Sequence, residues 1–391
     1  MAKTVRWGIL ATGAIAETFS RDLLVDPRTR NVTSIIHKIV AAASSSGASR
    51  ATDFLRNIGA PLEAKAYGSY KELVADPEVD IVYVATPHSH HYQNAMLCLE
   101  AGKNVLCEKA FTVNAAQARA LAEKARERNL FLMEAIWIRY LPLSIYVRDL
   151  ITSGRLGNVT RVTADNSANL NPEVSWADGQ HRMVNPDLAG GALLDLGIYS
   201  LTWIFQTLYH TQACPTPPTV VSSLRKYSTG TDEMTSILLT FPRPEGDAHG
   251  IATTAMRIDS DITQSGASGA AVRVQGDNGE LQVWPPIWRP TKTKLILRDG
   301  TVEDKVWPQP GPGKGSGWFN GFMAKHAEGE GYGMFWEADE AALAIIEGRK
   351  EGRYADLSES IAVMDVMDQV RRQNGLDYPE KIETTQYPVE L

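Results

Sequence analysis

The chain has 391 residues, of which 43% are hydrophobic and 22% charged, and its net charge is −7 at pH 7. These values are ordinary for a globular protein, and the length suits two domains of about 150 to 200 residues each. The acidic balance predicts no nucleic-acid partner, because binding to phosphates requires basic surface. No apolar run approaches the roughly 18 residues of a membrane span, so no membrane association is expected. Three cysteines without C-x-x-C spacing indicate a reducing compartment, and a cytoplasmic protein is expected.

Residues 1–134 alternate between strand and helix patterns, which is typical of a doubly wound parallel sheet. The expected strands are Val5–Leu10, Ile39–Ala43, Ile81–Thr86, Val105–Cys107 and Leu130–Glu134. The expected helices are Ser49–Ile58, Ser69–Ala75, His90–Ala101 and Asn114–Asn129, preceded by one that ends near Leu24. A dinucleotide-binding Rossmann domain is therefore predicted for residues 1–134.

The turn after the first strand carries a partial G-x-G-x-x-G fingerprint, with Ala11, Gly13 and Ala16 at the three glycine positions. A helix that starts directly after such a turn presents free N–H groups and its positive dipole end to a pyrophosphate. The expected contacts with the dinucleotide are Gly8, Ala11, Thr12, Gly13, Ala14 and Ile15. Partial matches are frequent, so this turn alone leaves dinucleotide binding open.

The end of the second strand indicates which dinucleotide is bound. NAD sites place Asp or Glu there, about 20 residues after the glycines, to bind the ribose 2′-hydroxyl. Here the strand runs into Ser44, Ser45 and Ser46, with Arg50 one helical turn later and no carboxylate. Hydroxyls and a guanidinium suit a 2′-phosphate, so NADP is the predicted cofactor. A plain serine-rich loop is the alternative.

A lysine stands at the carboxyl end of a predicted strand, in the run Cys107-Glu108-Lys109-Ala110. In open parallel sheets, ligands bind in the crevice outside these ends, and a lysine there is placed to act on a substrate. Glu108 and Lys109 are therefore candidates for cofactor contact, and Lys109 is a candidate catalytic residue. The alternative is a surface ion pair, which is common for adjacent acidic and basic residues.

A histidine-rich stretch, Thr86-Pro87-His88-Ser89-His90-His91, follows another predicted strand. No metal site is expected, because this spacing does not place three ligands on one face and no cysteine or carboxylate cluster accompanies it. Cofactor contacts are expected instead from Thr86, Pro87, His88 and His91. At the domain boundary, Trp137 and Arg139 alternate with apolar neighbours and are also predicted to face the cofactor, although packing is the default interpretation for Trp137.

Asp195 and Tyr199 stand four residues apart in a glycine-rich helical segment, so they share a helix face. Taken alone, the Asp suits a helix cap and the Tyr suits core packing. If this helix faces the cofactor crevice, Lys109, Asp195 and Tyr199 converge. A neighbouring ammonium lowers the pKa of a phenol, which predicts Tyr199 as the acid/base group for an alcohol being oxidised.

Residues 135–391 predict an α+β domain with a mostly antiparallel, open-faced sheet. Its expected strands are Thr235–Phe241, Gly250–Met256, Ala271–Gln275, Glu280–Trp284 and Lys292–Arg298, and its expected helices are Leu143–Thr152, Gly190–Tyr209, Met334–Gly348 and Leu357–Asn374. The Gly- and Pro-rich stretch Pro308–Gly333 is predicted to be a loop.

Too few helices follow those strands to cover both faces of the sheet. Trp284, Ile287 and Trp288 crowd one corner, and large apolar groups left exposed mark an interface or a binding groove. The sheet therefore predicts a homodimer, with the Trp284–Trp288 corner near a substrate pocket.

Over nearly its whole length the sequence resembles the Gfo/Idh/MocA oxidoreductase family. Residues 8–15 are similar to the family's nucleotide turn, and residues 86–91 to its T-P-N-x-x-H stretch, with His88 at the Asn position. Residues 108–110 are similar to its E-K-P motif and residues 195–199 to its D-x-G-x-[HY] segment, in the Tyr version found in dimeric dihydrodiol dehydrogenases. Ala11 for Gly and Ala110 for Pro depart from the pattern.

Within that branch, residues 85–91, 102–112 and 181–191 look like the corresponding runs of fungal NADP-dependent D-xylose 1-dehydrogenases. The resemblance implies oxidation of the anomeric hydroxyl of a pyranose aldose to the lactone, with D-xylose as the expected sugar. It also implies a sheet that often mediates dimerisation. The expected substrate contacts are Trp137, His181, Arg182, Asp195, Tyr199 and Trp288. Two other functions stay open: a trans-1,2-dihydrodiol dehydrogenase, and a non-catalytic NADP-binding sensor, which would have no need of Lys109, Asp195 and Tyr199.

Overall fold

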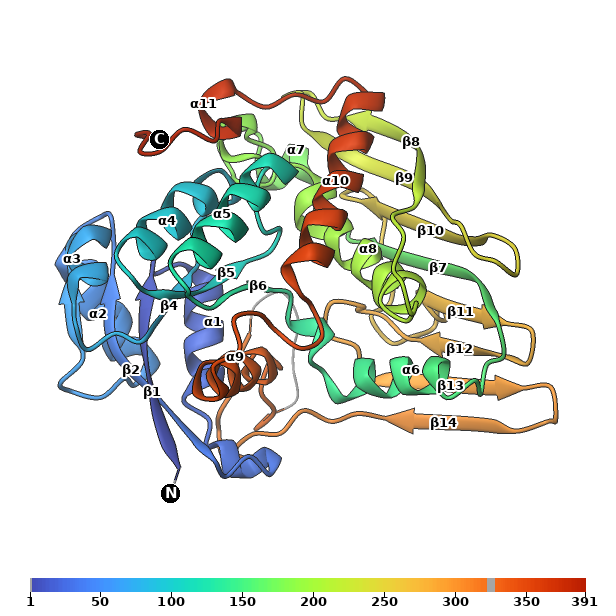
Figure 1. Ribbon diagram of the computed structural model, residues 1–391, viewed down its shortest axis with the longest axis horizontal. Coiled ribbons are helices and arrows are strands. Elements are labelled where there is room, and N and C mark those ends of the chain that lie inside the picture. Colours follow the sequence, from blue (N-terminus) through green and yellow to red (C-terminus); the bar gives the residue numbers. More distant parts are fainter. Residues whose placement is uncertain (1, 322–327) are drawn as a thin grey trace.

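The computed structural model describes residues 2–321 and 328–391, and its first half is a six-stranded parallel sheet (Figure 1). The strands, in the order β3-β2-β1-β4-β5-β6, are Lys65–Tyr67, Ile35–Ala43, Lys3–Leu10, Ile81–Val84, Asn104–Glu108 and Leu132–Ala135. The helices between them are α1 (Ala14–Leu23), α2 (Ala48–Ile58), α3 (Tyr70–Ala75), α4 (His88–Glu100) and α5 (Ala115–Glu127), with the short helix η1 (Pro27–Arg30). The strand order reverses between β1 and β4, so the crevice for a dinucleotide lies at their carboxyl ends. The predicted Rossmann fold is confirmed.

The second sheet has eight strands in the order β14-β13-β12-β11-β7-β10-β9-β8. In that order they are Val302–Val306, Lys292–Leu297, Gly279–Val283, Val272–Gly276, Val159–Ser167, Ala248–Ala255, Asp232–Phe241 and Thr219–Lys226. β7 and β10 pair in parallel, and the other neighbours pair antiparallel. The predicted mostly antiparallel sheet is confirmed.

Helices cover one face of this second sheet: α6 (Pro142–Thr152), α8 (Ile198–Ile204) and α10 (Leu357–Gln373) lie against it in Figure 1. α8 is flanked by the π-helical turns η4 (Leu193–Gly197) and η5 (Phe205–Tyr209). The remaining helices are η2 (Trp137–Arg139), α7 (Pro172–Ser175), η3 (Pro186–Leu188), α9 (Phe335–Glu347) and α11 (Glu380–Glu383). On the uncovered face, β9 alternates between exposed and buried residues, so the sheet is open-faced as predicted.

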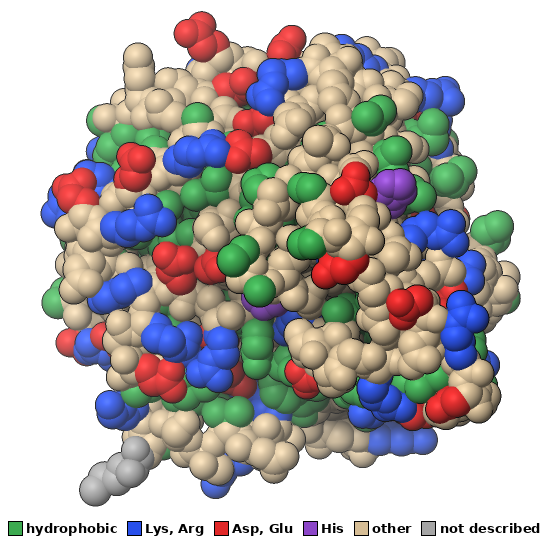
Figure 2. Space-filling view, turned by 45° about the vertical axis from the view of Figure 1, so that its right-hand side comes forward, with side chains coloured by type: hydrophobic (Ala, Val, Ile, Leu, Met, Phe, Trp, Pro, Cys, Tyr) green, Lys and Arg blue, Asp and Glu red, His purple; other side chains and the backbone are tan. Residues whose placement is uncertain are grey.

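The exposed apolar side chains of the sheet are not where the sequence predicted them. At the Trp284–Trp288 corner, Ile287 is 1% exposed and both tryptophans are half-buried. The side chains that are exposed are Val221, Met234, Leu238 and Ile251 on β8, β9 and β10, and Val302 and Val306 on the edge strand β14. The face of the molecule drawn in Figure 2 mixes acidic and basic side chains without a large patch of either sign.

One helical run, Pro186–Tyr209, is long and apolar enough to cross a membrane, contrary to the expectation that no run approaches that length. Its most apolar stretch is 89% buried, because α8 and its flanking turns pack on the second sheet and against α6 and α10. The run is therefore a core helix of this fold, which explains its composition.

The two halves are joined through α9, which returns from the second half to pack on α1 and β2. The buried carboxylate of Asp339 on α9 accepts hydrogen bonds from Arg30 Nε and Nη2 at 2.6 and 2.7 Å. It also contacts His37 Nε2 at 2.8 Å, and His37 Nδ1 accepts a bond from Trp7 at 3.1 Å, which assigns the histidine proton to Nε2. Residues 334–391 therefore pack against both halves of the molecule. The domain boundary between residues 134 and 135 stays a prediction.

The predicted loop Pro308–Gly333 includes residues 322–327, which lie outside the described residues. Its described parts cross α1, where Asn320 Nδ2 donates to Asp22 Oδ1 at 2.7 Å. The loop thus lies against the nucleotide domain.

Candidate active site at the junction of the two domains

The turn after β1 is open to solvent where the nucleotide phosphates are expected. Gly13 is the N-cap of α1, and a Cβ added to it would meet no atom within 4 Å. Ala11 has a left-handed φ of 80°, so the turn keeps the backbone shape of the fingerprint without its first glycine. The other predicted residues of the turn, Thr12, Ala14 and Ile15, are half-buried or exposed. These residues fit a pyrophosphate on the N-terminus of α1.

Gly8 does not belong to that turn. It is buried in β1, and a Cβ on it would approach Val79 to 3.0 Å and Leu73 to 3.3 Å. Its lack of a side chain serves close packing, and its contact with the cofactor stays a prediction.

The carboxyl end of β2 provides the residues predicted for a 2′-phosphate. Ser44 is buried and accepts a hydrogen bond from Ser46 N at 3.2 Å, which shapes the turn. Ser45, Ser46 and Arg50 are exposed, with Arg50 in the first turn of α2. In the part of the chain that the structure describes, no carboxylate pairs with Arg50. An unpaired guanidinium beside two exposed hydroxyls fits a phosphate.

Lys109, Asp195 and Tyr199 come together at the carboxyl end of β5. Lys109 Nζ donates to the backbone oxygen of Asp195 at 2.9 Å and to its Oδ1 at 3.1 Å. The same ammonium lies 4.9 Å from the centre of the Tyr199 ring. The three groups therefore meet across the domain junction, where a substrate has to lie to reach the cofactor crevice.

Asp195 is surrounded by positive charge. Arg182 Nη1 donates to its Oδ1 at 2.9 Å, and His88 Nε2 lies 3.9 Å from the same oxygen. Burial favours the protonated acid, but the positive charges of Arg182 and Lys109 outweigh burial and hold the pKa of Asp195 well below its ordinary value. Asp195 is thus a carboxylate at every physiological pH.

Tyr199 departs from the expectation that Lys109 lowers its pKa. Burial, and then the nearby carboxyl of Glu108, raise the pKa of Tyr199 well above its ordinary value. Lys109 does not counter these effects, because its ammonium lies over the face of the ring and is already bonded to Asp195. In this structure the phenol keeps its proton.

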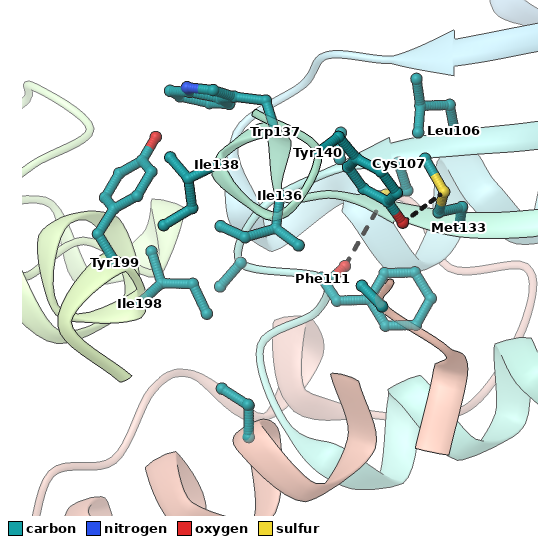
Figure 3. Close-up of a cluster of buried hydrophobic side chains, with 14 of the residues drawn as sticks. Leu106, Cys107, Phe111, Met133, Ile136, Trp137, Ile138, Tyr140, Ile198 and Tyr199 are labelled. Carbon is teal, nitrogen blue, oxygen red and sulfur yellow. Dashed lines mark hydrogen bonds between the residues drawn. The ribbon is translucent and has the colours of Figure 1, made fainter. Parts of the chain in front are cut away.

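An aromatic wall stands beside Tyr199. The Trp137 ring meets the Tyr199 ring edge-on at 5.2 Å, and its indole N–H donates to Trp288 O at 2.8 Å. Trp288 in turn stacks on Tyr332 at 5.5 Å. Figure 3 shows Tyr199 and Ile198 on one side of the segment that carries Trp137, with Tyr140 and Met133 on its other side. Trp137 and Tyr332 are 2% and 1% exposed, so Trp288 is the member of this wall that a sugar or an aromatic diol can reach.

His91 lies under the site and not in it. It is 1% exposed, and its Nδ1 and Nε2 contact the carbonyl oxygens of Ala110 and Thr86 at 2.9 and 2.8 Å. Both ring nitrogens face backbone carbonyls, and the neutral ring donates to only one of them. Direct cofactor contact through the ring is corrected to a positioning role: His91 lies between the Thr86-Pro87 turn, which stays a candidate cofactor contact, and the turn that carries Lys109.

Arg139 and Glu108 were also predicted to contact the cofactor, and the structure directs both inward. Arg139 is 1% exposed, pairs with Glu359 at 2.6 Å and donates to Tyr354 O, so its guanidinium is engaged inside the protein. Glu108 is 3% exposed and accepts hydrogen bonds from the Tyr83 hydroxyl and from Lys109 N. Burial, countered in part by Lys109, raises the pKa of Glu108 to about 7. Sequence spacing gave the strand ends correctly but not the direction of these side chains.

The predicted substrate residues His181 and Arg182 lie on the segment between β7 and η4. The His181 ring stacks on Trp176 at 4.2 Å, and the Arg182 guanidinium reaches Asp195 although its side chain is 44% exposed. They form the outer edge of the cluster.

Tyr332 is a residue of the wall that sequence reasoning missed. Its backbone N–H donates to Asp22 Oδ1 at 2.8 Å and its carbonyl accepts from Arg289 Nε at 3.0 Å. No local sequence signal marks it, because it stands in a glycine-rich loop and both partners are distant in sequence.

Comparison with known proteins agrees with this architecture. Residues 5–136 match the oxidoreductase family model with an NAD-binding Rossmann fold, GFO_IDH_MocA, and residues 145–282 match the GFO/IDH/MocA C-terminal domain. The fold resembles an NAD binding oxidoreductase from Klebsiella pneumoniae with a TM-score of 0.75 at 20% identity, covering 94% of this chain and 96% of the other. It also resembles an aldose-aldose oxidoreductase from Caulobacter crescentus with a TM-score of 0.71 at 21% identity, covering 95% and 97%.

The curated relatives are closer in sequence. The chain is 53% identical over 391 residues to the D-xylose 1-dehydrogenase (NADP(+)) of Hypocrea jecorina, covering 98% of this chain and 95% of that one. It is 36% identical over 380 residues to the trans-1,2-dihydrobenzene-1,2-diol dehydrogenase of Sus scrofa, covering 96% and 98%. Fold and site thus define a two-domain oxidoreductase with a dinucleotide-binding domain. The chain belongs to the Gfo/Idh/MocA family, as the sequence motifs predicted.

Proposed function

We propose that the protein is an NADP-dependent dehydrogenase that oxidises the anomeric hydroxyl of a pyranose aldose, D-xylose in the first place, to the lactone. The observation that carries the proposal is the convergence of Lys109, Asp195 and Tyr199 beside an open phosphate turn. The identity of 53% with the Hypocrea jecorina enzyme over nearly the whole chain supports both the sugar and NADP.

Each residue of the cluster has a separate role in the oxidation of the alcohol. Bound NADP supplies the hydride acceptor and, in its oxidised form, a positively charged nicotinamide ring. Tyr199 takes the hydroxyl proton, a step that requires its phenolate. Lys109 donates a hydrogen bond to the reacting oxygen, and Asp195 holds Lys109 in place. Since burial raises the pKa of Tyr199, oxidation is expected to run faster at alkaline pH, where the phenolate is more populated.

The test is a panel of aldoses and diols, each with NADP and with NAD, followed by nicotinamide absorbance from pH 6 to 10. The proposal expects the highest kcat/KM for D-xylose with NADP, and a rate that increases with pH. Lactone should be recovered before aldonic acid. A panel in which no aldose reduces NADP would overturn the proposal.

A trans-dihydrodiol dehydrogenase is the second candidate, favoured by the wall of Trp137, Trp288 and Tyr332 and by the relatives from mammals. A flat aromatic diol gains from stacking on Trp288 in such a wall. A kcat/KM for trans-1,2-dihydrobenzene-1,2-diol above that for every aldose would decide for it. A non-catalytic sensor is not favoured, because it needs no acid/base group and would have no use for the polar cluster of Lys109, Asp195 and Tyr199.

We further propose that the open face of the second sheet joins two copies of the chain. Pairing registers place Val221, Leu238 and Ile251 in one row across β8, β9 and β10, and they are 65%, 40% and 37% exposed. Met234 adds a fourth apolar side chain on β9. A self-complementary apolar row flanked by polar residues is what a two-fold interface requires.

Sedimentation equilibrium at micromolar protein tests the dimer. The native chain should sediment at twice its 42.9 kDa mass, and Leu238→Glu should shift it toward the monomer. Ile36→Glu is the control, because Ile36 is 49% exposed on β2, away from the second sheet. A native protein that stays monomeric at all concentrations contradicts the dimer.

A further inference from the structure

His88 is the first residue of α4 and lies beside the catalytic cluster, although the sequence assigned it to the cofactor. Its side chain is 7% exposed. Its Nδ1 lies 3.3 Å from the carbonyl oxygen of Ala189, and its Nε2 lies 3.9 Å from Asp195 Oδ1. Its two ring nitrogens thus face different partners, a backbone carbonyl on one side and the active site on the other.

The proton of His88 is fixed by these partners. A carbonyl oxygen only accepts hydrogen bonds, so Nδ1 must carry the proton. Nε2 then presents a lone pair, and its distance to Asp195 is too long for a hydrogen bond. Burial lowers the pKa of His88 to about 3, so the ring stays neutral. The charge of Asp195 opposes this shift, and the charges of Lys109 and Arg182 add to it.

Nε2 is therefore an acceptor next to donors. Lys109 Nζ and Arg182 Nη1 lie 3.1 and 2.9 Å from the oxygen that Nε2 faces. A group that donates to Nε2 while it accepts from an ammonium or a guanidinium is a hydroxyl, which has one O–H and two lone pairs. Neither a carboxylate nor a bare C–H satisfies both sides.

We propose that His88 is a substrate-binding residue that accepts a hydrogen bond from the hydroxyl on the carbon next to the reacting one, so that the site selects 1,2-diols. The inference rests on the proposed function, which places the reacting hydroxyl at Tyr199 and Lys109. It names what an aldose and a trans-dihydrodiol have in common: in the pyranose the neighbour is the C2 hydroxyl, and in the dihydrodiol it is the second hydroxyl of the pair.

The experiment compares D-xylose with 2-deoxy-D-xylose in native protein, His88→Phe and His88→Gln. In the native protein, kcat/KM should be about 10² lower for the deoxy sugar, since a site built to bond a hydroxyl rejects the analogue that lacks it. His88→Phe should lose about 10-fold to 10² with D-xylose and change little with the deoxy sugar, so its ratio should approach one. His88→Gln keeps an acceptor oxygen and should restore part of the preference.

Two further measurements separate the alternatives. Kd for NADP, measured by quenching of tryptophan fluorescence, should be the same in all three proteins. If Kd rises 10-fold in His88→Phe while the ratio of kcat/KM between the two sugars is unchanged, His88 belongs to the cofactor site. A ratio that stays at about 10² in His88→Phe would equally overturn the proposal. Calorimetry also measures the binding of both sugars to the NADPH complex. Absence of turnover would refute the proposed function, but the two binding constants would still show whether the site prefers the sugar with the C2 hydroxyl. Thermal unfolding checks that each variant is folded.

Discussion

At the scale of single residues, the site depends on which way each side chain points. Sequence position identified Lys109, Asp195 and Tyr199 because strand ends and helical spacing fix where their backbones lie. It failed for Arg139, which pairs with Glu359 inside the protein. That direction follows from tertiary partners, which no local pattern encodes.

Tyr199→Phe and Lys109→Met should each lower kcat by about 10² to 10⁴, the range for losing a positioned acid/base group. Neither residue belongs to the phosphate turn, so Kd for NADP should stay within a few-fold of the native value. Stopped-flow rates of a single turnover give the chemical step directly. If Tyr199→Phe keeps near-native rates, the proton acceptor is another residue, and His181 at the outer edge of the cluster is the next to test.

Arg50→Ala should weaken discrimination for NADP over NAD by about 2 to 3 kcal/mol, on the scale of a charge-assisted bond to the 2′-phosphate. kcat/KM should fall with NADP and hold with NAD. Arg56→Ala is the matched control, since Arg56 stands on the same helix, is 72% exposed and pairs with Asp53. Equal losses with both nucleotides would show that Arg50 does not read the phosphate.

At the scale of elements, strands and helices with strong periodicity were predicted well and weak ones were missed. β3 has three residues and β14 is exposed throughout, so neither shows the alternation that identifies a strand. The run Gly190–Tyr209 was predicted as one helix, and the structure divides it by two π-helical turns. Asp195 lies in the first of them, yet it still reaches Lys109, so the site survived an inexact assignment of its helix.

The end of β6 offers a test of burial in one element. Glu134 is 4% exposed and accepts hydrogen bonds from Phe111 N at 2.9 Å and Ser360 Oγ at 2.7 Å. Burial, countered in part by these bonds, raises the pKa of Glu134 to about 7. Between its unfolded pKa near 4.5 and pH 7 the native state keeps a proton that the unfolded state releases. The contribution of Glu134 to the free energy of unfolding is therefore fully present below pH 4.5, and it falls by about 3 kcal/mol as pH rises to 7.

Glu134→Gln removes that titration and keeps both hydrogen bonds. Its free energy of unfolding, relative to native protein, should rise from pH 5 to pH 7.5 by an amount on the order of that loss. Urea titrations at four pH values measure it, with the exposed Glu123→Gln as control. A difference that does not change with pH would mean that Glu134 is ionised in the native state.

At the scale of the whole molecule, the two domains hold the site between them through buried charge. Asp22 on α1 is fully buried and accepts backbone N–H bonds from Tyr332, Gly333 and Met334 at 2.7 to 2.8 Å. The same segment is held from the second domain by Arg289, which donates to Gly331 O at 2.7 Å. The aromatic wall of the site is therefore fixed from both sides, an arrangement that depends on residues about 300 positions apart and so was invisible to sequence patterns.

Asp22→Ala should cost about 3 to 5 kcal/mol of stability, because it leaves several buried donors without an acceptor. Denaturant unfolding measures that loss, and Asp53→Ala on α2, where Asp53 is 52% exposed, should change stability by no more than about 0.5 kcal/mol. Since Tyr332 loses its support, KM for the sugar should rise in Asp22→Ala while Kd for NADP, which depends on the turn at Gly13, changes less. A loss of stability without any change in KM would show that the clamp serves the fold alone, and that the wall at Tyr332 is held by Arg289.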